Sequence, residues 1–345
     1  IHFSHLPYAD ENGELEPDGV VTGTIGLGDI DVFTFEANAN EAVHIRMVET
    51  GDDTNFSPYI WLYNPDGTLE RTINGSSTVA ALDCYSTGSC QLEQTGTYRI
   101  LVQDDGDAYA GKYRIHFSHM PYAKENGRLT NNGTVVGKIS LGDVDSFTFD
   151  AKENEAIHIR MVERGLDTRF NPYIWLYDPD GNLVDRDSGN GTVAALNCYS
   201  TGSCRLKKTG TYTILVQDDG DGHVGKYRIH LSHMPYATES APLVNDGVVT
   251  GTIGLGDIDA FTFDAKKNEA VHIRMVERGE DTRFNPYIWL YNPDGVLVDR
   301  DRGNGTVAAL DCYSRGSCRL QETGTYRLLV QDDGDNQRGK YEIHF

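Results

Sequence analysis

Apolar and polar residues alternate along this chain in short runs that are separated by Gly, Asp and Asn. In the run Ala-Ile-His-Ile-Arg-Met at 156–161, the apolar side chains would share one face of a strand, with His158 and Arg160 on the other. Phe147 and Phe149 share a face in the same way. Such runs leave little room for helices and predict an antiparallel β-sandwich. In the middle of the chain they fall at 135–139, 146–149, 156–161, 173–177, 182–184, 193–196, 211–216 and 226–230.

One run stands out because its three copies contain the three tryptophans of the chain. Tyr59-Ile60-Trp61-Leu62-Tyr63 is apolar on both faces, which is typical of a central sandwich strand. The Asn-Pro-Asp-Gly that follows sets φ with proline and supplies glycine for the reversal, so a hairpin is predicted there. We expect the aromatic side chains to lie in the sandwich core rather than on a ligand-binding face.

This run recurs at a fixed interval. Trp61, Trp175 and Trp289 are each separated by 114 residues, with no insertion between copies. A period this long corresponds to whole domains, and about 110 residues suffice for one hydrophobic core. The chain is therefore predicted to be all-β, with three tandem antiparallel β-sandwich domains of jelly-roll or immunoglobulin-like type arranged as a rod.

Several motifs resemble, in order, the bacterial pre-peptidase C-terminal domain family. They are Gly28–Phe35, the Trp61 strand with its turn, Thr95–Val102 and Gly111–Ile115, and they recur in all three copies. The resemblance implies β-sandwiches attached to secreted proteases and other exported proteins, some of which bind calcium, carbohydrate or collagen. It also implies the domain limits. Residues 1–8 would be the last strand of a preceding repeat, followed by domains at 9–118, 123–232 and 237–345.

This chain departs from the family pattern by carrying no catalytic partner domain and by adding a disulfide. The junctions between domains are short and contain proline with apolar neighbours, as in Ser118–Ala123 and Ser232–Ala237. Such junctions should pack rather than move freely. A stiff rod is the expected result.

The charge of the chain narrows its partners. Asp and Glu number 52 against 30 Lys and Arg, a formal charge of -22. Such a surface repels nucleic acid and anionic lipid, and the apolar runs are too short to span a membrane. Because the sequence opens with Ile and has no signal peptide, we expect it to be an excised or processed segment.

Each repeat contains one pair of cysteines with five residues between them. A turn-forming Gly between them favours a local disulfide, which the chain-entropy model values at roughly 2 kcal/mol. A thiolate metal site is the alternative, but the spacing does not match the usual one. Disulfides imply an extracellular or cell-surface location. The pairs are Cys84 with Cys90, Cys198 with Cys204, and Cys312 with Cys318.

Acidic loops are the candidate metal sites, and calcium is the only cofactor that we consider. Clustered carboxylates with a flexible glycine suit a hard, oxygen-seeking ion. Asp and Gly are also ordinary turn formers, and the spacing is not that of an EF-hand. The carboxylates of Asp29 and Asp31 are expected to cap backbone N–H groups. The candidate ligands are Asp104, Asp105, Asp107, Asp218, Asp219, Asp221, Asp332, Asp333 and Asp335.

Sequons for N-glycosylation occupy equivalent loops in the three repeats. Asn-Gly is also a favoured hairpin turn, so a purely structural role is the alternative. Asn55 also begins a sequon, but Pro58 disfavours it. The candidate acceptors are Asn74, Asn190, Asn304 and Asn132.

No catalytic set is recognisable, and we expect no enzyme. The strand histidines, such as His44 and His158, and the His-x-x-His pairs fit a solvated face or a domain junction, with a metal site at the junctions as the alternative. Two function classes remain. The first is a non-catalytic extracellular fibre, stalk or adhesin shaft whose partners are covalent glycans and neighbouring repeats or subunits of the same protein. The second is a carbohydrate- or collagen-binding accessory module of a secreted enzyme.

Overall fold

The structure is a computed structural model of the 345-residue chain. It describes residues 2, 4–9, 11–51, 55–75, 78–84, 90–165, 169–189, 191–197, 205–279, 283–312, 319–334 and 337–345. Strands dominate the described residues, and no helix among them is long and apolar enough to cross a membrane.

Eight strands follow one another in each copy of the sequence repeat. Sandwich 1 contains β1 (Gly19–Ile25), β2 (Asp31–Ala37), β3 (Ala42–Glu49), β4 (Pro58–Tyr63), β5 (Leu69–Asn74), β6 (Val79–Leu82), β7 (Gly96–Asp104) and β8 (Gly111–Met120). Sandwich 2 contains β9 (Gly133–Ile139), β10 (Asp145–Ala151), β11 (Ala156–Glu163), β12 (Pro172–Tyr177), β13 (Leu183–Ser188), β14 (Val193–Leu196), β15 (Gly210–Asp218) and β16 (Gly225–Met234). Sandwich 3 contains β17 (Val248–Ile253), β18 (Asp259–Ala265), β19 (Ile273–Glu277), β20 (Pro286–Tyr291), β21 (Leu297–Arg302), β22 (Val307–Leu310), β23 (Gly324–Asp332) and β24 (Gly339–His344).

Each sandwich has two four-stranded antiparallel sheets with the same strand order. In sandwich 1 the orders are β1-β8-β3-β6 and β2-β7-β4-β5, and the other two sandwiches repeat them. Strands adjacent in sequence alternate between the sheets until the β4–β5 hairpin, which is the connectivity of a jelly roll. The predicted all-β class with tandem sandwiches is confirmed.

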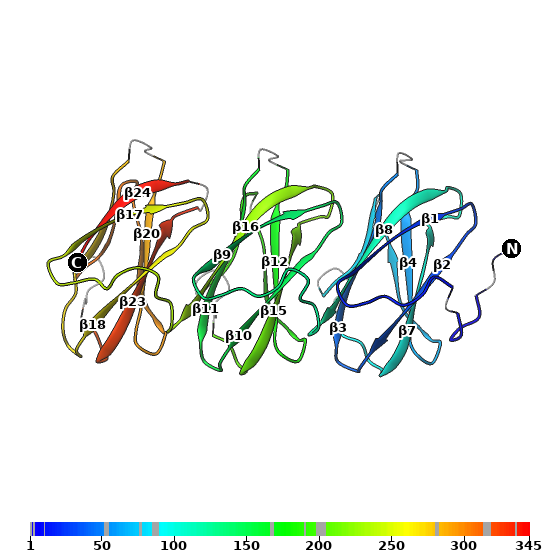
Figure 1. Cartoon of the computed structure of the whole chain (residues 1–345), viewed down its shortest axis with the longest axis horizontal. Helices are drawn as coiled ribbons and strands as arrows, with labels where there is room; N and C mark the ends of the chain where they lie inside the picture. Colours follow the sequence, from blue (N-terminus) through cyan, green and yellow to red (C-terminus); the bar gives the residue numbers. More distant parts are fainter. Residues whose placement is uncertain are drawn as a thin grey trace.

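The three sandwiches lie in a line, so the molecule is a rod with the chain ends at opposite ends (Figure 1). This arrangement follows from the junctions. β8 continues to Met120 and pairs with β3 over its last residues, so the sheet of one sandwich extends directly to the proline that begins the next. The linker between neighbouring sandwiches is therefore very short. The exact domain limits stay a prediction.

One repeated contact inside the sandwiches involves a glycine, a tyrosine and an aspartate. A Cβ at Gly23 would lie 2.3 Å from the hydroxyl oxygen of Tyr113, so the ring occupies the space above the glycine. The Tyr113 hydroxyl donates to the carboxylate of Asp31, and Tyr227 donates to Asp145 in the same way. Asp31 therefore holds a buried tyrosine instead of the backbone N–H groups expected from the sequence, whereas Asp29 accepts from the N–H of Gly26 at 3.3 Å.

The tryptophan strands are central, as predicted, but their aromatic side chains do not fill the sandwich cores. Ile60 and Leu62 point into the core and are buried. Because side chains alternate along a strand, Tyr59, Trp61 and Tyr63 lie on the opposite face of the sheet. The expected core position of the aromatics is corrected here, because the core needs only one face of β4.

Candidate functional site: the interface between sandwiches

The outward faces of two sheets meet at each junction along the rod. Sandwich 1 presents the sheet that contains β3 and β8, and sandwich 2 presents the sheet that contains β12 and β15 (Figure 1). Trp175 is fully buried by this contact and belongs to the same apolar cluster as the core of sandwich 1. Trp289 is buried in the same way between sandwiches 2 and 3. The tryptophans therefore join neighbouring sandwiches.

A histidine of the preceding sandwich packs against each of these tryptophans. The ring of His44 meets Trp175 edge to face at 4.9 Å between centroids, and its Nε2 lies 2.5 Å from the hydroxyl of Tyr177. His158 repeats the contact with Trp289 at 5.2 Å. Of the two positions that the sequence left open for these histidines, a solvated face or a domain junction, the structure has the junction. Edge-to-face aromatic packing adds to the effect of burial.

Arg46 carries a buried charge across the first interface. Its Nη1 donates to Gln217 Oε1 at 2.5 Å, and its Nε lies 2.7 Å from Asp221 Oδ1. Gln217 also accepts from Trp175 Nε1 at 3.1 Å, so the ion pair and the aromatic contact share one network. Removing one partner would leave a desolvated charge, which is costly. The interface is thus specific as well as apolar.

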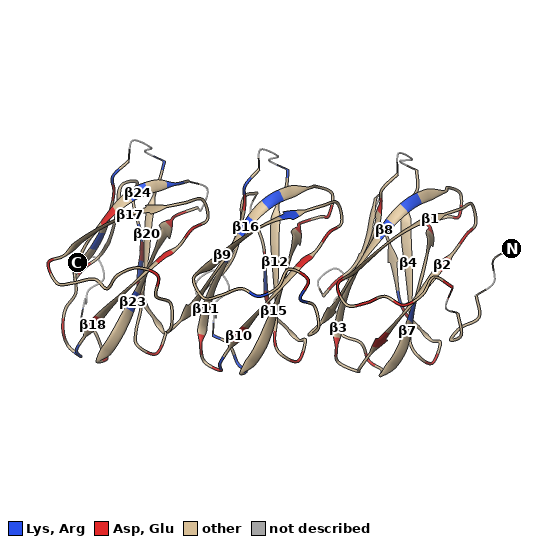
Figure 2. Ribbon diagram, viewed as in Figure 1, with Lys and Arg blue, Asp and Glu red and all other residues tan. Residues whose placement is uncertain are grey.

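Figure 2 shows the basic and acidic positions along the rod.

Burial shifts the ionisation of the interface groups. It lowers the pKa of His44 to about 3 and that of Arg160 to about 9. It also raises the pKa of Asp221, against the opposing effect of Arg46. The histidine is therefore neutral at pH 7, when it contacts the tryptophan edge and the Tyr177 hydroxyl.

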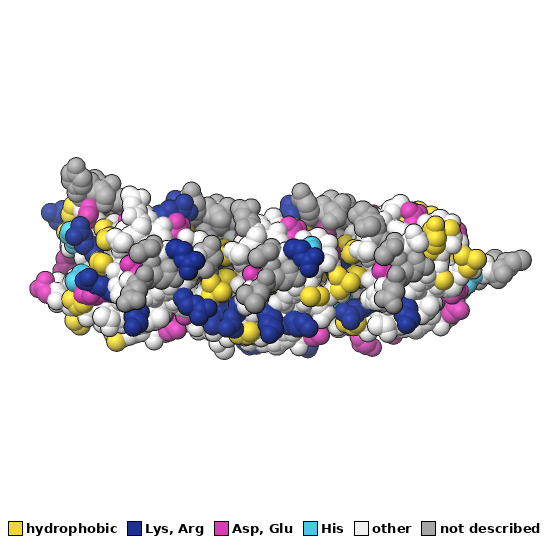
Figure 3. Space-filling view, turned by 90° about the horizontal axis from the view of Figure 1, so that it is seen from above, with side chains coloured by type: hydrophobic (Ala, Val, Ile, Leu, Met, Phe, Trp, Pro, Cys, Tyr) yellow, Lys and Arg dark blue, Asp and Glu magenta, His cyan; other side chains and the backbone are white. Residues whose placement is uncertain are grey.

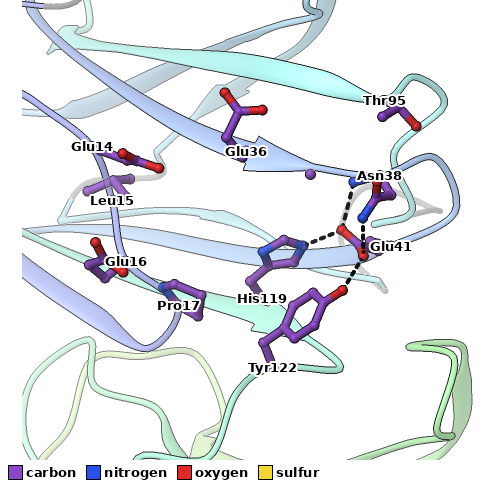
Figure 4. A pocket seen from close by; sticks show the side chains of 11 residues that line it. Glu14, Leu15, Glu16, Pro17, Glu36, Asn38, Glu41, Thr95, His119 and Tyr122 are labelled. Atoms are coloured by element: carbon purple, nitrogen blue, oxygen red, sulfur yellow. Dashed lines mark hydrogen bonds and ion pairs between the residues drawn. The ribbon is translucent and has the colours of Figure 1, made fainter.

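A second polar cluster closes the edge of each junction (Figure 4). His119 Nε2 lies 2.9 Å from Glu41 Oε2, and the hydroxyl of Tyr122 donates to Glu41 Oε1 at 2.8 Å. His233 and Glu155 form the same pair at 2.6 Å in the next repeat. The His-Met-Pro-Tyr junctions are thus anchored to the sandwich they leave, by a carboxylate that precedes β3 or β11.

A glycine loop of each following sandwich packs against a valine of the preceding one. A Cβ at Gly142 would lie 1.9 Å from Val48 Cγ2, and one at Gly256 would lie 2.2 Å from Val162 Cγ2. Both glycines have φ of +65°. They therefore allow a left-handed turn and a close approach of the two sandwiches.

The acidic loops have structural roles in the described residues. Asp104 is buried, and its carboxylate accepts from the backbone N–H groups of Ser57, Ala108 and Tyr109 at 2.9–3.0 Å. Asp218 and Asp332 accept from equivalent loop N–H groups.

The other candidate carboxylates point to separate partners. Asp105 accepts from the Asn74 side chain at 3.0 Å and Asp107 from Gln103 at 3.0 Å. Asp221 binds Arg46, and Asp219 accepts from Asn171 at 3.1 Å. Arg302 lies 2.9 Å from Asp333, and Asp335 falls outside the described residues.

These oxygens do not converge on a common point. Among the described residues, the one group of three potential ligands comprises His44, Cys84 and Cys90. Its sulfurs are joined as a disulfide, so it lacks thiolate ligands. Calcium at the acidic loops stays a prediction.

The structure joins Cys84 to Cys90, with their Cα atoms 4.3 Å apart. Tyr177 lies across the junction with its hydroxyl 3.3 Å from Cys84 Sγ, so this disulfide borders the interface. Cys312 is also disulfide-bonded. Cys198, Cys204 and Cys318 lie outside the described residues.

The sequon asparagines differ in exposure. Asn74 and Asn304 are exposed, whereas Asn132 is half-buried at a turn with φ of +55°. Asn190 lies outside the described residues. Asn74 and Asn304 are therefore the more accessible acceptors, and glycosylation itself stays a prediction.

Sequence reasoning missed the network of Arg46, Gln217 and Asp221. A signal was present, because His and Arg recur on the outward face of one strand and Trp recurs on the outward face of another in every repeat. Two outward faces with complementary side chains, repeated in register, indicate a contact between copies.

Comparisons with known proteins concern single sandwiches or the whole array. The pre-peptidase C-terminal domain of a collagenase from Bacillus anthracis is 20% identical, over 31% of this chain and 96% of that one, with a TM-score of 0.25. The periplasmic inhibitor of g-type lysozyme, PliG, from Salmonella Typhimurium is 19% identical, over 32% and 99%, with a TM-score of 0.24. A triple jelly-roll protein of an archaeal virus is 11% identical, over 93% and 82%, with a TM-score of 0.20. No family model and no curated protein matches the chain.

Proposed function

We propose that this chain is a non-catalytic structural protein, a segment of an extracellular fibre, stalk or adhesin shaft built from tandem pre-peptidase-C-terminal-like sandwiches. The observation that carries the proposal is the interface that occurs twice along the rod. It buries Trp175 and Trp289 together with their histidine partners. When every pair of neighbouring sandwiches makes the same contact, the sandwiches stack in a straight line and the rod resists bending.

The chemistry of the junctions supports stiffness. Arg46 is buried at 2% exposure, and its ion pair with Asp221 is lost if the sandwiches separate. Burial of an aromatic and an ion pair at one junction makes hinge motion costly. A shaft that holds a distant domain away from a surface needs this property.

An extracellular location is supported by the Cys84–Cys90 disulfide, because such bonds persist in oxidising compartments. The exposed sequon residues Asn74 and Asn304 lie on the outside of the rod, where glycans would not disturb the junctions. We propose that these positions carry glycans in the native material. Intact-mass spectrometry of that material tests this directly.

The alternative is a module that binds carbohydrate or collagen. Its natural platform would be the Tyr-Trp-Tyr face, but this face is covered by the preceding sandwich at Trp175 and Trp289. Only the Trp61 face is partly exposed among the three tryptophan faces. A binding function would thus be confined to one end of the rod, which favours the structural role.

Electron microscopy of the purified 345-residue chain at high dilution tests the proposal. We expect straight particles of three lobes with a narrow distribution of bend angles. A wide distribution of bend angles would contradict a structural shaft. Specific binding on a glycan array, abolished by Trp61→Ala, would support the alternative.

A further inference from the structure

A cavity of about 390 Å³ lies on sandwich 2, where β13 ends. One wall is the buried ring of Tyr173, while Ser188 and Asp219 are exposed at its rim. The cavity therefore places an aromatic ring next to a carboxylate that solvent can reach. The described residues that line it are Tyr173, Arg186, Asp187, Ser188 and Asp219.

Sandwich 3 fills the equivalent place with a guanidinium group of its own. Four of the five lining residues have identical counterparts there, but Arg302 stands where sandwich 2 has Ser188. Arg302 Nε lies 2.9 Å from Asp333 Oδ1, and its Cζ lies 5.7 Å from the centroid of the Tyr287 ring. The same residue types thus bind a guanidinium group in the neighbouring copy. The identical counterparts are Tyr287, Arg300, Asp301 and Asp333.

The strand register sets the position of this fifth side chain. Ser188 lies directly opposite Tyr173 in the β12–β13 pair, as Arg302 lies opposite Tyr287 in the β20–β21 pair. Side chains of directly opposite residues on neighbouring strands contact each other. A serine is too short to cover the ring and reach the carboxylate, so the cavity is left beside it.

Asp219 has a carboxylate oxygen to offer to a ligand. Its Oδ2 accepts from Asn171 Nδ2 at 3.1 Å, and Oδ2 of Asp333 accepts from Asn285 Nδ2 at 3.2 Å. The second oxygen of Asp333 is the one that binds Arg302. No side chain among the described residues binds the second oxygen of Asp219.

Sandwich 1 satisfies the same carboxylate with an amide. Asn74 lies opposite Tyr59, and its Nδ2 donates to Asp105 Oδ2 at 3.0 Å. Sandwiches 1 and 3 therefore both supply a donor from this strand position. In sandwich 2, with Ser188, the donor has to come from outside the chain.

Arg186 does not take the place of that donor, because it is held on the opposite side of the tyrosine. Its Nη1 donates to the Tyr173 hydroxyl at 2.5 Å, and its Cζ lies 5.7 Å from the centroid of the Trp175 ring. Arg300 makes both contacts in sandwich 3. Since Arg302 binds beside Arg300 there, a second guanidinium group can bind beside Arg186.

From these observations we propose that the cavity beside Ser188 binds a guanidinium group from outside the chain. The group lies over the Tyr173 ring and pairs with Asp219, as Arg302 does with its own neighbours. A guanidinium suits this site better than an ammonium, because its planar fork pairs with carboxylates and stacks on aromatic rings. An arginine side chain of a partner protein and a free guanidino compound share this chemistry. The site is independent of the structural role of the rod.

Local contacts, rather than net charge, select the ligand. The formal charge of -22 attracts cations of every kind to the rod. Lys and Arg side chains are nevertheless exposed along the face seen from above (Figure 3). A cation that is held only by the overall charge would have no preference for one sandwich, whereas a guanidinium group should bind at sandwich 2 and not at sandwich 3.

NMR spectroscopy of the isotope-labelled 345-residue chain tests this, with ethylguanidinium as the probe and N-ethylurea as its neutral analogue of the same shape. We expect ethylguanidinium at millimolar concentration to shift the backbone amide of Asp219 in a saturable way. The amide of Asp333 should not respond, because Arg302 already fills that site. N-ethylurea should shift neither amide. If ethylguanidinium shifted neither amide, or both equally, the proposal would be overturned.

Exchanges at the one differing position sharpen the test. Ser188→Arg should supply the guanidinium group from within the chain and abolish the response of Asp219. Arg302→Ser should open a second site, so that Asp333 then responds as Asp219 does. The matched control Ser188→Ala should bind like the wild type. An unchanged Asp219 response in Ser188→Arg, or a silent Asp333 in Arg302→Ser, would contradict the assignment.

The carboxylate is tested separately. Asp219→Asn keeps the size of the side chain but removes its charge, and it should weaken ethylguanidinium binding about fivefold, as expected for an exposed ion pair. All of these positions lie at the surface, and the Arg302 side chain is 62% exposed, so the variants should fold like the wild type. Equal binding by Asp219→Asn would show that the ion pair is not part of the site.

A second probe identifies the source of the group. The peptide Gly-Arg-Gly presents the same guanidinium on a backbone. Binding about tenfold tighter than that of ethylguanidinium would assign the site to an arginine of a polypeptide partner. Equal binding of the two probes would assign it to free guanidino compounds. Both results support the site itself, and a peptide that fails to shift Asp219 while ethylguanidinium succeeds would exclude a polypeptide partner.

Discussion

The imidazole of His44 packs edge to face on the indole of Trp175, 131 residues further along the chain, with ring centroids 4.9 Å apart and planes at 88°. One ring belongs to sandwich 1 and the other to sandwich 2. The same pair recurs as His158 and Trp289. The repeat sequence thus encodes both a folding unit and the contact that joins one unit to the next.

Trp175→Ala should destabilise the chain much more than Trp61→Ala. Trp175 is fully buried between two sandwiches, whereas Trp61 at the equivalent position of sandwich 1 is only half-buried. We expect losses of about 3–5 kcal/mol and about 1 kcal/mol respectively in the free energy of unfolding. Urea unfolding of the two variants and the wild type measures both losses. Equal losses would contradict the interface described here.

Asp221→Asn should leave the buried Arg46 with only the more distant carboxylate of Asp83, whose Oδ2 lies 4.0 Å from Arg46 Nη2. Breaking a buried pair on one side typically costs about 3–5 kcal/mol. The matched control is Asp107→Asn at the exposed equivalent position of sandwich 1, where a change within about 0.5 kcal/mol is expected. Thermal unfolding of the two variants, side by side, gives the comparison. A harmless Asp221→Asn would mean that the ion pair contributes nothing to the junction.

The first junction should weaken in acid because of His44. Burial lowers its pKa to about 3, and Asp83, Arg46 and His116 are the charged or titratable groups that act on it. Above the unfolded pKa of about 6.5, His44 is neutral in both the folded and the unfolded chain, so its burial in neutral form costs no stability. As the pH falls from there toward 3, only the unfolded chain binds the proton, and the free energy of unfolding decreases.

His44→Gln isolates this contribution from the carboxylates that titrate in the same range. Between pH 6 and 3.5 the wild type should lose about 1.4 kcal/mol per pH unit more than the variant. His272→Gln, at an exposed position, should follow the wild type at every pH. Parallel curves for His44→Gln and wild type would show that His44 is not buried in a neutral form.

The sequence predicted the features that depend on local patterns, but not the contacts between segments far apart in the chain. The 114-residue period, the strand alternation and the proline turns predicted the sandwiches, because each is a local pattern. Trp61 was misassigned to the core, since alternation shows that two faces are apolar but not what covers the second. The partner of Asp221 is 175 residues away in the chain at Arg46, and no local pattern indicates such a pairing.

Asp104→Ala should destabilise sandwich 1 by about 1–3 kcal/mol, because three loop N–H groups lose their acceptor. The loss should be the same with and without a calcium chelator. Differential scanning calorimetry under both conditions is the measurement. If chelator alone lowered the melting temperature of the wild type, and not of the variant, a calcium role for this loop would be restored.

The histidine–tryptophan contact holds neighbouring sandwiches together. A double-mutant cycle tests this most directly. His44→Ala and Trp175→Ala should be non-additive, with a coupling of about 1 kcal/mol or more in the free energy of unfolding. The cycle of His272→Ala with Trp61→Ala, whose residues lie at opposite ends of one chain, should be additive at high dilution. Additivity within about 0.3 kcal/mol for His44 and Trp175 would contradict the account.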